Sequence, residues 1–211
     1  DIEHEQMGFV VTDNLTIEHV QKTTWPSGTT RYQGCEVTLS GIVTADTSQY
    51  SSGYSSYAFQ DGTGQWSGLV FDTPPLEMVV LSRGDDVTVT GTIEDFDPDW
   101  HFKFDGNTRL INSTIVVNSS GNNAPSPSLI SCSDVAFGAE DSDPESYEGV
   151  LVKMNQVTIS MVNDFDWTIT DASGAVTLID DDMATMLADN AMSEFVEGQE
   201  LEYVSGIFNY S

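Results

Sequence analysis

The sequence predicts an all-β protein with short helices, and three observations support this prediction. Apolar residues alternate with polar ones in strand-like segments, as at Val37, Leu39 and Val43 and again at Val87 and Val89. A pattern of similar sequence blocks occurs twice along the chain. A content of 39% hydrophobic and 10% aromatic residues is enough for a folded core despite a net charge of −28.

The repeat consists of four blocks that recur in the same order. They are 15–20 with 130–135, 32–34 with 147–149, 59–71 with 169–178, and 84–90 with 198–204. In the third pair, Leu69 and Phe71 match Val176 and Leu178. Repeated blocks indicate two units of one architecture, each with its own core.

The repeat sets the expected domains. We expect an N-terminal arm at 1–13, a first domain at 14–118, a linker at 119–129 and a second domain at 130–211. Residues 118–128 read NSSGNNAPSPS and are rich in turn-forming residues. Short helical turns are expected at 15–21, 76–81 and 130–137, and a longer helix at 182–196.

The order of elements within a repeat predicts a five-stranded Greek-key barrel of the OB-fold type. Each repeat has a long first strand, a hairpin around a sequence such as Asp61–Gly64, a helical turn and a fourth strand that follows a glycine. We therefore expect two tandem OB-like barrels. The second lacks a last strand of its own.

Three segments also resemble a known group of proteins. YQGCEVTLSGIVTA at 32–45, FQDGTGQWSGLVF at 59–71 and RGDDVTVTGTIEDF at 83–96 resemble the OB-fold modules attached to nucleases and phosphoesterases in secreted bacterial proteins. The resemblance covers 15–118 well and 130–211 more loosely. It implies the fold and an extracellular location, but no catalytic residue can be transferred from it.

The second repeat ends without a closing strand, whereas the N-terminal arm contains a spare one. The candidate donor strand has Met7, Phe9, Val10 and Val11, and the candidate acceptor region has Ile207, Phe208 and Tyr210. The arm could close the second barrel of its own chain, or the closing strand could be missing because the chain was truncated. Alternatively, it could complete a neighbouring copy and so build a head-to-tail filament.

Charge and aromatic residues limit the expected ligands. Six basic residues against 34 acidic ones disfavour nucleic acid as a partner, because binding to phosphates depends on basic groups. Tyr54, Tyr57, Trp66 and Trp100 are candidate ligand-binding residues for carbohydrate or protein. A flexible surface loop rich in Tyr and Ser is the alternative interpretation.

Two further features allow two interpretations each. Asp95, Asp97 and Asp99 alternate along one segment and could bind Ca²⁺, or they could form a solvated acidic loop. Cys35 and Cys132 could form a disulfide, or they could be two buried thiols.

No nucleophile or metal-protease motif accompanies the three histidines, so the sequence predicts no catalytic activity. No apolar run is long enough to span a membrane as a helix. The first functional hypothesis is an extracellular structural or adhesive protein that assembles into a filament. The alternative is an accessory module of a larger secreted hydrolase that binds carbohydrate, nucleic acid or protein.

Overall fold

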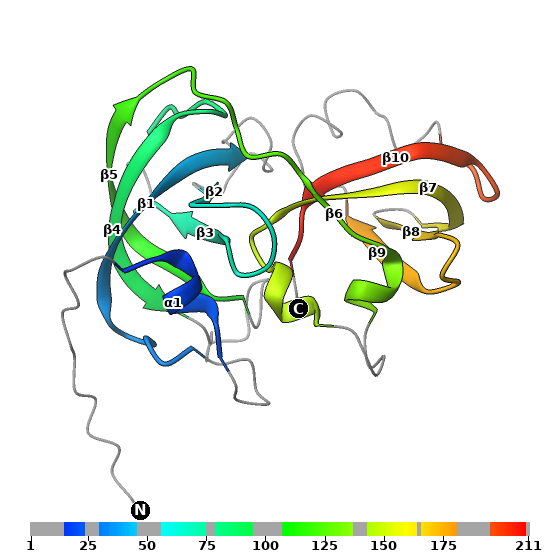
Figure 1. Ribbon diagram of the computed structural model, residues 1–211, viewed down its shortest axis with the longest axis horizontal. Helices are drawn as coiled ribbons and strands as arrows, with labels where there is room; N and C mark the ends of the chain where they lie inside the picture. The colour runs from blue at the N-terminus through cyan, green and yellow to red at the C-terminus, as the bar shows by residue number, and fades with distance from the viewer. Residues whose placement is uncertain are drawn as a thin grey trace, which may run out of the picture.

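The computed structural model describes residues 15–23, 30–45, 56–74, 79–94, 107–136, 143–163, 166–180 and 195–209. They form two β-sheets that lie side by side along the long axis of the molecule (Figure 1). The elements, in chain order, are α1 (Ile17–Gln21), β1 (Glu36–Ala45), β2 (Ser56–Gln60), β3 (Gly68–Asp72), β4 (Asp86–Glu94), β5 (Arg109–Ser119), β6 (Ser128–Leu129), η1 (Cys132–Val135), η2 (Pro144–Tyr147), β7 (Leu151–Val162), β8 (Asp166–Thr170), β9 (Val176–Asp180) and β10 (Glu200–Ile207). The prediction of an all-β protein with short helices is confirmed.

The first sheet is a closed barrel with the strand order β1-β2-β3-β5-β4. Its neighbouring strands are antiparallel except for β3 and β5, which run parallel. Alternate residues point inward, so that Val87 and Val89 of β4 are fully buried between exposed or half-buried neighbours. Tyr57, Phe59 and Phe71 form the aromatic centre of this core.

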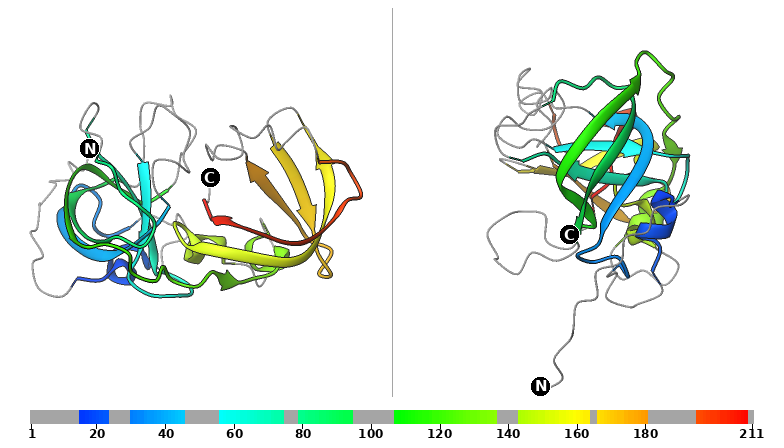
Figure 2. Two further views of the ribbon diagram at one scale, coloured as in Figure 1. Left: turned by 90° about the horizontal axis from the view of Figure 1, so that it is seen from above. Right: turned by 90° about the vertical axis from the view of Figure 1, so that its left-hand side faces the viewer.

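The second sheet has the order β10-β7-β8-β9, with β6 added parallel to β7. Within the described ranges, β9 pairs only with β8 and β10 pairs only with β7. Figure 2 shows the contrast between the ring of the first sheet and the splayed strands of the second. In the described part of the chain, β9 and β10 therefore each have one unpaired side.

The same backbone hydrogen bonds occur in both halves of the chain. Gly34 donates to the carbonyl of Ile93 at 2.8 Å, and 115 residues later Gly149 donates to the carbonyl of Phe208 at 2.8 Å. A second matched pair joins Gly84 to Val43 at 2.9 Å and Gly198 to Ile159 at 2.8 Å. The matched donors and acceptors are 114–116 residues apart, so the repeat in sequence corresponds to a repeat of contacts in space.

The start of the short helix is held in the same way in each half. The backbone N–H of Ile17 donates to Asp61 Oδ2 at 2.8 Å, and that of Cys132 donates to Asp171 Oδ2 at 2.8 Å. The first N–H groups of a helix have no partner within it, so a carboxylate from the following hairpin satisfies one of them. The turns expected at 15–21 and 130–137 are present as α1 and η1.

The match of Leu69 and Phe71 to Val176 and Leu178 is wrong by one residue. Strand pairing places Ile179 opposite Trp167, as Phe71 lies opposite Tyr57. Val176 and Leu178 consequently point outward and are 53% and 59% exposed, whereas Leu69 and Phe71 are completely buried. A shift of one residue along a strand exchanges its two faces.

The disulfide between Cys35 and Cys132 is not formed, and both are buried free thiols. Cys35 belongs to the first core and Cys132 to the second. The Sγ atom of Cys132 lies 3.9 Å from Met154 Sδ. The two thiols are separated because each fills its own core, which was the second of the two interpretations.

A polar, close-packed interface joins the two sheets. The Gln60 side chain accepts a hydrogen bond from the backbone N–H of Leu151 at 2.8 Å, and the Gln21 amide donates to the carbonyl of Glu148 at 3.4 Å. A Cβ atom on Gly68 would lie 2.3 Å from the carbonyl oxygen of Gly149. The backbones can approach this closely only because side chains are absent there.

The expected turn at 76–81 and helix at 182–196 lie largely outside the described residues, as does the arm at 1–13. Among the described residues, no helix is long and apolar enough to cross a membrane.

Candidate functional site at the barrel mouth

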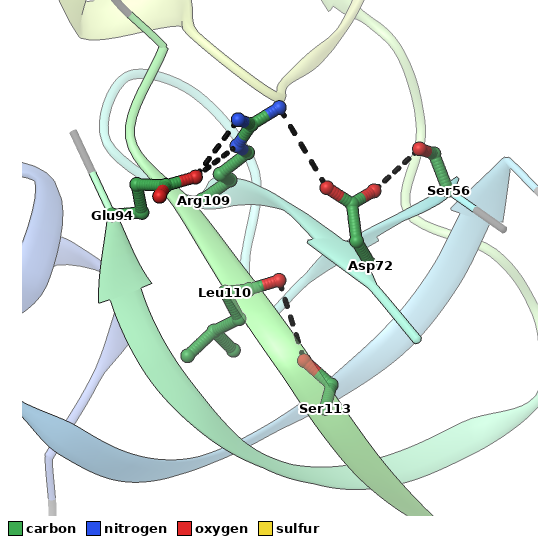
Figure 3. Close-up of polar contacts among 6 residues, drawn as sticks. All are labelled: Ser56, Asp72, Glu94, Arg109, Leu110 and Ser113. Atoms are coloured by element: carbon green, nitrogen blue, oxygen red, sulfur yellow. Dashed lines mark hydrogen bonds and ion pairs between the residues drawn. The ribbon is translucent and has the colours of Figure 1, made fainter. Parts of the chain in front are cut away.

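Four polar residues lie at one end of the first barrel, which we call the barrel mouth: Ser56, Asp72, Glu94 and Arg109. Ser56 begins β2 and is paired with Asp72 at the end of β3. Glu94 ends β4 and is paired with Arg109 at the start of β5. Since β5 also runs beside β3, the barrel order brings the side chains together (Figure 3).

Arg109 lies between two carboxylates. Its Nη2 and Nε atoms donate to Glu94 Oε2 at 2.8 and 3.1 Å, and its Nη1 atom lies 3.7 Å from Asp72 Oδ2 (Figure 3). The hydroxyl of Ser56 donates to the other carboxylate oxygen of Asp72. These charged side chains are between a fifth and a third exposed, so the group is held rigidly yet accessible from solvent.

Burial raises the pKa of the Asp72 carboxyl above its ordinary value. The hydrogen bond from Ser56 and the charge of Arg109 oppose this shift of the pKa, and the charge of Glu94 adds to it. One guanidinium between two carboxylates leaves a net negative site. Such a set of donors and acceptors suits hydroxyl-bearing ligands better than phosphate.

The chain segments that start and finish at the barrel mouth carry several predicted ligand residues. Residues 46–55, with Tyr54, join β1 to β2, and residues 95–106, with Trp100, join β4 to β5. Tyr54, Trp100 and the proposed Ca²⁺ ligands Asp95, Asp97 and Asp99 all lie outside the described residues. Their roles stay predictions. The part of the chain that the structure describes has no group of three or more metal-binding side chains.

The other two predicted ligand residues lie elsewhere. Tyr57 is completely buried, stacks on Phe71 with a centroid distance of 4.9 Å, and donates its hydroxyl to the carbonyl of Val79 at 2.6 Å. Trp66 is half-buried in the turn after β2, where its backbone N–H donates to the carbonyl of Ser146 at 2.6 Å. Tyr57 is therefore a core residue, and Trp66 lies at the interface between the sheets.

The predicted donor residues Met7, Phe9, Val10 and Val11 lie outside the described residues, as does Tyr210 of the acceptor region.

In the rest of the acceptor region, Ile207 packs against Ala45 and Ala58 of the first barrel. The backbone of Phe208 is bonded to Gly149 and Val150.

Sequence reasoning missed the four residues of the barrel mouth. Ser56, Asp72, Glu94 and Arg109 are far apart in the chain and follow no motif. One signal was available: Arg109 is one of only six basic residues and directly precedes the apolar stretch that closes the barrel. An isolated cation in so acidic a chain indicates a specific ion pair.

Comparison with known proteins gives one informative similarity. The chain is 29% identical over 184 residues to the endonuclease YhcR of Bacillus subtilis (strain 168), a match that covers 83% of this chain and 14% of YhcR. No family model matches the chain, and no solved structure matches it. The chain is thus similar to a small part of a much longer endonuclease.

This similarity corrects the prediction that the chain has no catalytic activity. The expectation rested on the absence of familiar catalytic motifs, and the similarity to an endonuclease contradicts it. A motif search recognises only chemistry whose residues are close together in sequence. Residues brought together by strand pairing, such as Asp72 and Arg109, escape it.

Proposed function

We propose that the chain is an accessory ligand-binding module of a larger, exported nucleic-acid hydrolase, with two tandem OB-fold units. The observation that carries this proposal is the similarity to YhcR, which spans most of this chain but only 14% of the endonuclease. The barrel order β1-β2-β3-β5-β4, with its single parallel pair, supports the OB-fold. Of the two functional hypotheses, the accessory module has this support, and the filament has none from the comparisons.

The ligand of the module is proposed to be a neutral carbohydrate that binds at the barrel mouth. Carboxylates, a guanidinium and a hydroxyl provide donors and acceptors for sugar hydroxyl groups, and the adjoining segments carry Tyr54 and Trp100 for stacking. A Ca²⁺ ion bound by Asp95, Asp97 and Asp99 would be carried by the same segment.

Nucleic acid is a poorer candidate because basic side chains are few and three of the six are already engaged. Arg109 is paired with Glu94, and the Nζ atom of Lys22 lies 2.8 Å from Glu18 Oε1. Lys153 lies 3.8 Å from the centroid of the Tyr203 ring. A surface with net charge −28 has little left to neutralise phosphates.

The test is binding of the purified chain to immobilised neutral polysaccharides and, in parallel, to single- and double-stranded DNA. We expect retention on at least one polysaccharide and a loss of about tenfold in affinity for Arg109→Gln, because the orientation of both carboxylates depends on that guanidinium. Lys153→Gln, which removes the same charge from the second sheet, is the matched control.

Two results would count against this proposal. One is binding to DNA that weakens steeply with salt, which would identify a polyanion-binding module. The other is polysaccharide binding that Arg109→Gln and Lys153→Gln alter equally, which would place the ligand elsewhere.

A further inference from the structure

As far as the described strands go, the second sheet is open between β9 and β10, and the first barrel shows what would fill such an opening. There, β5 lies between β3 and β4, parallel to the former and antiparallel to the latter. Within the described residues, no strand occupies this position beside β9 and β10. Both edges present backbone N–H and C=O groups that a single extended strand could pair with.

The core beside the opening is incompletely covered. Ile179 and Leu201 pack against the second core but stay partly exposed. Phe71 and Val87, which hold the corresponding positions in the first barrel, are completely buried. An added strand with apolar residues at alternate positions would complete the burial, as Leu110 of β5 does in the first barrel.

The edge strand β9 has little of the usual protection against pairing. Its one charged residue, Asp180, is at its end, and it contains no proline. Val176 and Leu178 expose apolar side chains on its outer face. Edge strands that stay unpaired usually carry charges, prolines or bulges.

We propose that Met7–Val11 of a second copy of this chain occupies the opening. Met7, Phe9 and Val11 alternate and would share the inward face of an extended strand, like the apolar residues of β5. This segment precedes the first repeat and has no counterpart in the second. It matches the missing strand in type, and its five residues equal the length of β9, although β5 has 11 residues.

A second copy fits better than the same chain because of where the arm is anchored. Leu15 packs against the first core, and α1 contacts β3 of the first barrel. Only residues 12–14 separate Leu15 from Val11, a distance of about 14 Å when fully extended. Figures 1 and 2 show α1 in the half of the molecule that contains the first barrel, whereas β9 and the unpaired edge of β10 lie in the other half.

The contact is head-to-tail, since the arm of one copy enters the second sheet of the next. Such an interface does not close on itself and extends into a polymer. Both copies carry a charge of −28, so association strengthens with salt. The inference does not depend on the proposed function.

The test is analytical ultracentrifugation of the full chain over a wide range of concentration, at low salt and in about 0.5 M NaCl, where charges are strongly screened. We expect the average mass to rise above the 23.0 kDa of one chain, more so at high salt. Phe9→Asp should weaken association by about tenfold or more, because it places a charge in the buried face of the added strand. Thr12→Asp makes the same charge change outside the strand and is the control.

A second variant tests the acceptor. Val204→Lys places a charge on the partly exposed core side of β10, and Val116→Lys on the exposed surface of β5 is its control. The variants Phe9→Asp and Val204→Lys should each be monomeric alone. Mixed, they should form a one-to-one dimer, since each supplies the part that the other lacks.

The proposal is overturned by a wild-type chain that stays monomeric at every concentration and salt, which indicates closure within one chain or an edge that stays unpaired. It is also overturned by association that survives Phe9→Asp or Val204→Lys, with each variant shown by circular dichroism to be folded. The proposal is likewise overturned if a mixture of the two variants gives no dimer.

Discussion

Single carboxylates determine how the molecule responds to pH. Asp72 lies beside Arg109 and Ser56, but its burial dominates and raises its pKa. Asp171 is partly buried too, yet hydrogen bonds from Ser173 and Cys132 outweigh the burial and lower its pKa. Two aspartates in one protein thus respond oppositely to their surroundings.

The first prediction concerns Asp72→Asn. The folded state holds the proton of Asp72 more tightly than the unfolded chain does. The stabilising contribution of protonated Asp72 to the free energy of unfolding is therefore complete below the unfolded pKa of about 3.9 and is lost as pH rises through the folded pKa. The free energy of unfolding of Asp72→Asn should therefore fall less steeply with rising pH, above about pH 4, than that of the wild type. Urea denaturation at a series of pH values measures this.

The variant Asp171→Asn should change the pH dependence of stability in the opposite direction. Its lowered pKa means that the carboxylate stabilises the fold above the unfolded pKa and ceases to do so as pH falls through the folded value. The loss of stability on Asp171→Asn should therefore be largest near neutral pH and shrink in acid. Equal pH slopes for the two variants would contradict both assignments.

Arg109 shows why the site was harder to predict than the fold. Alternation of apolar residues such as Val87 and Val89 reports directly on a strand, because it depends on neighbours in sequence. The contact of Arg109 with Asp72 depends on β5 lying beside β3, which is a property of barrel closure. The predicted register of β9 was wrong for the same reason. Pairing with β8 decides which residues of β9 face the core, whereas the sequence of β9 is compatible with either face.

At the scale of elements, the contact between β3 and the turn before β7 holds the two sheets together. Gly68 and Gly149 meet there backbone to backbone. Gly149 also has a φ of 70°, a conformation that side chains disfavour. The interface therefore requires glycine for two separate reasons.

The second prediction is that Gly68→Ala destabilises the fold by about 3 kcal/mol, because its Cβ atom would overlap the backbone at Gly149. Gly206→Ala, in strand β10 with no atom within 4 Å of the added Cβ, should be neutral or stabilise by about 0.5 kcal/mol. Chemical denaturation of both variants measures the difference. Equal stabilities would show that the sheets are not packed as described.

At the scale of the whole molecule, buried hydrogen bonds couple the two sheets into one unit. Gln60 of the first barrel accepts from Leu151 of the second sheet, and Glu148 accepts from the backbone N–H of Thr108 at 2.8 Å. Loss of one sheet would leave these buried groups without their partners.

The third prediction is therefore a single calorimetric unfolding transition for the whole chain. Gln60→Ala should lower its stability by about 1–3 kcal/mol, since the N–H of Leu151 stays buried without a partner. Gln199→Ala removes an exposed side chain that accepts from Val196 at 3.3 Å and should have a much smaller effect. Two separate transitions in the wild type would show that the sheets fold independently.

The central proposal is that this chain serves as an accessory ligand-binding module of a larger nucleic-acid hydrolase. The most direct measurement is retention on immobilised neutral polysaccharide, compared between the complete gene product and a version without residues 15–209. The account predicts that retention is lost with these residues in a shortened protein that remains folded. Unchanged retention by the shortened protein would contradict it.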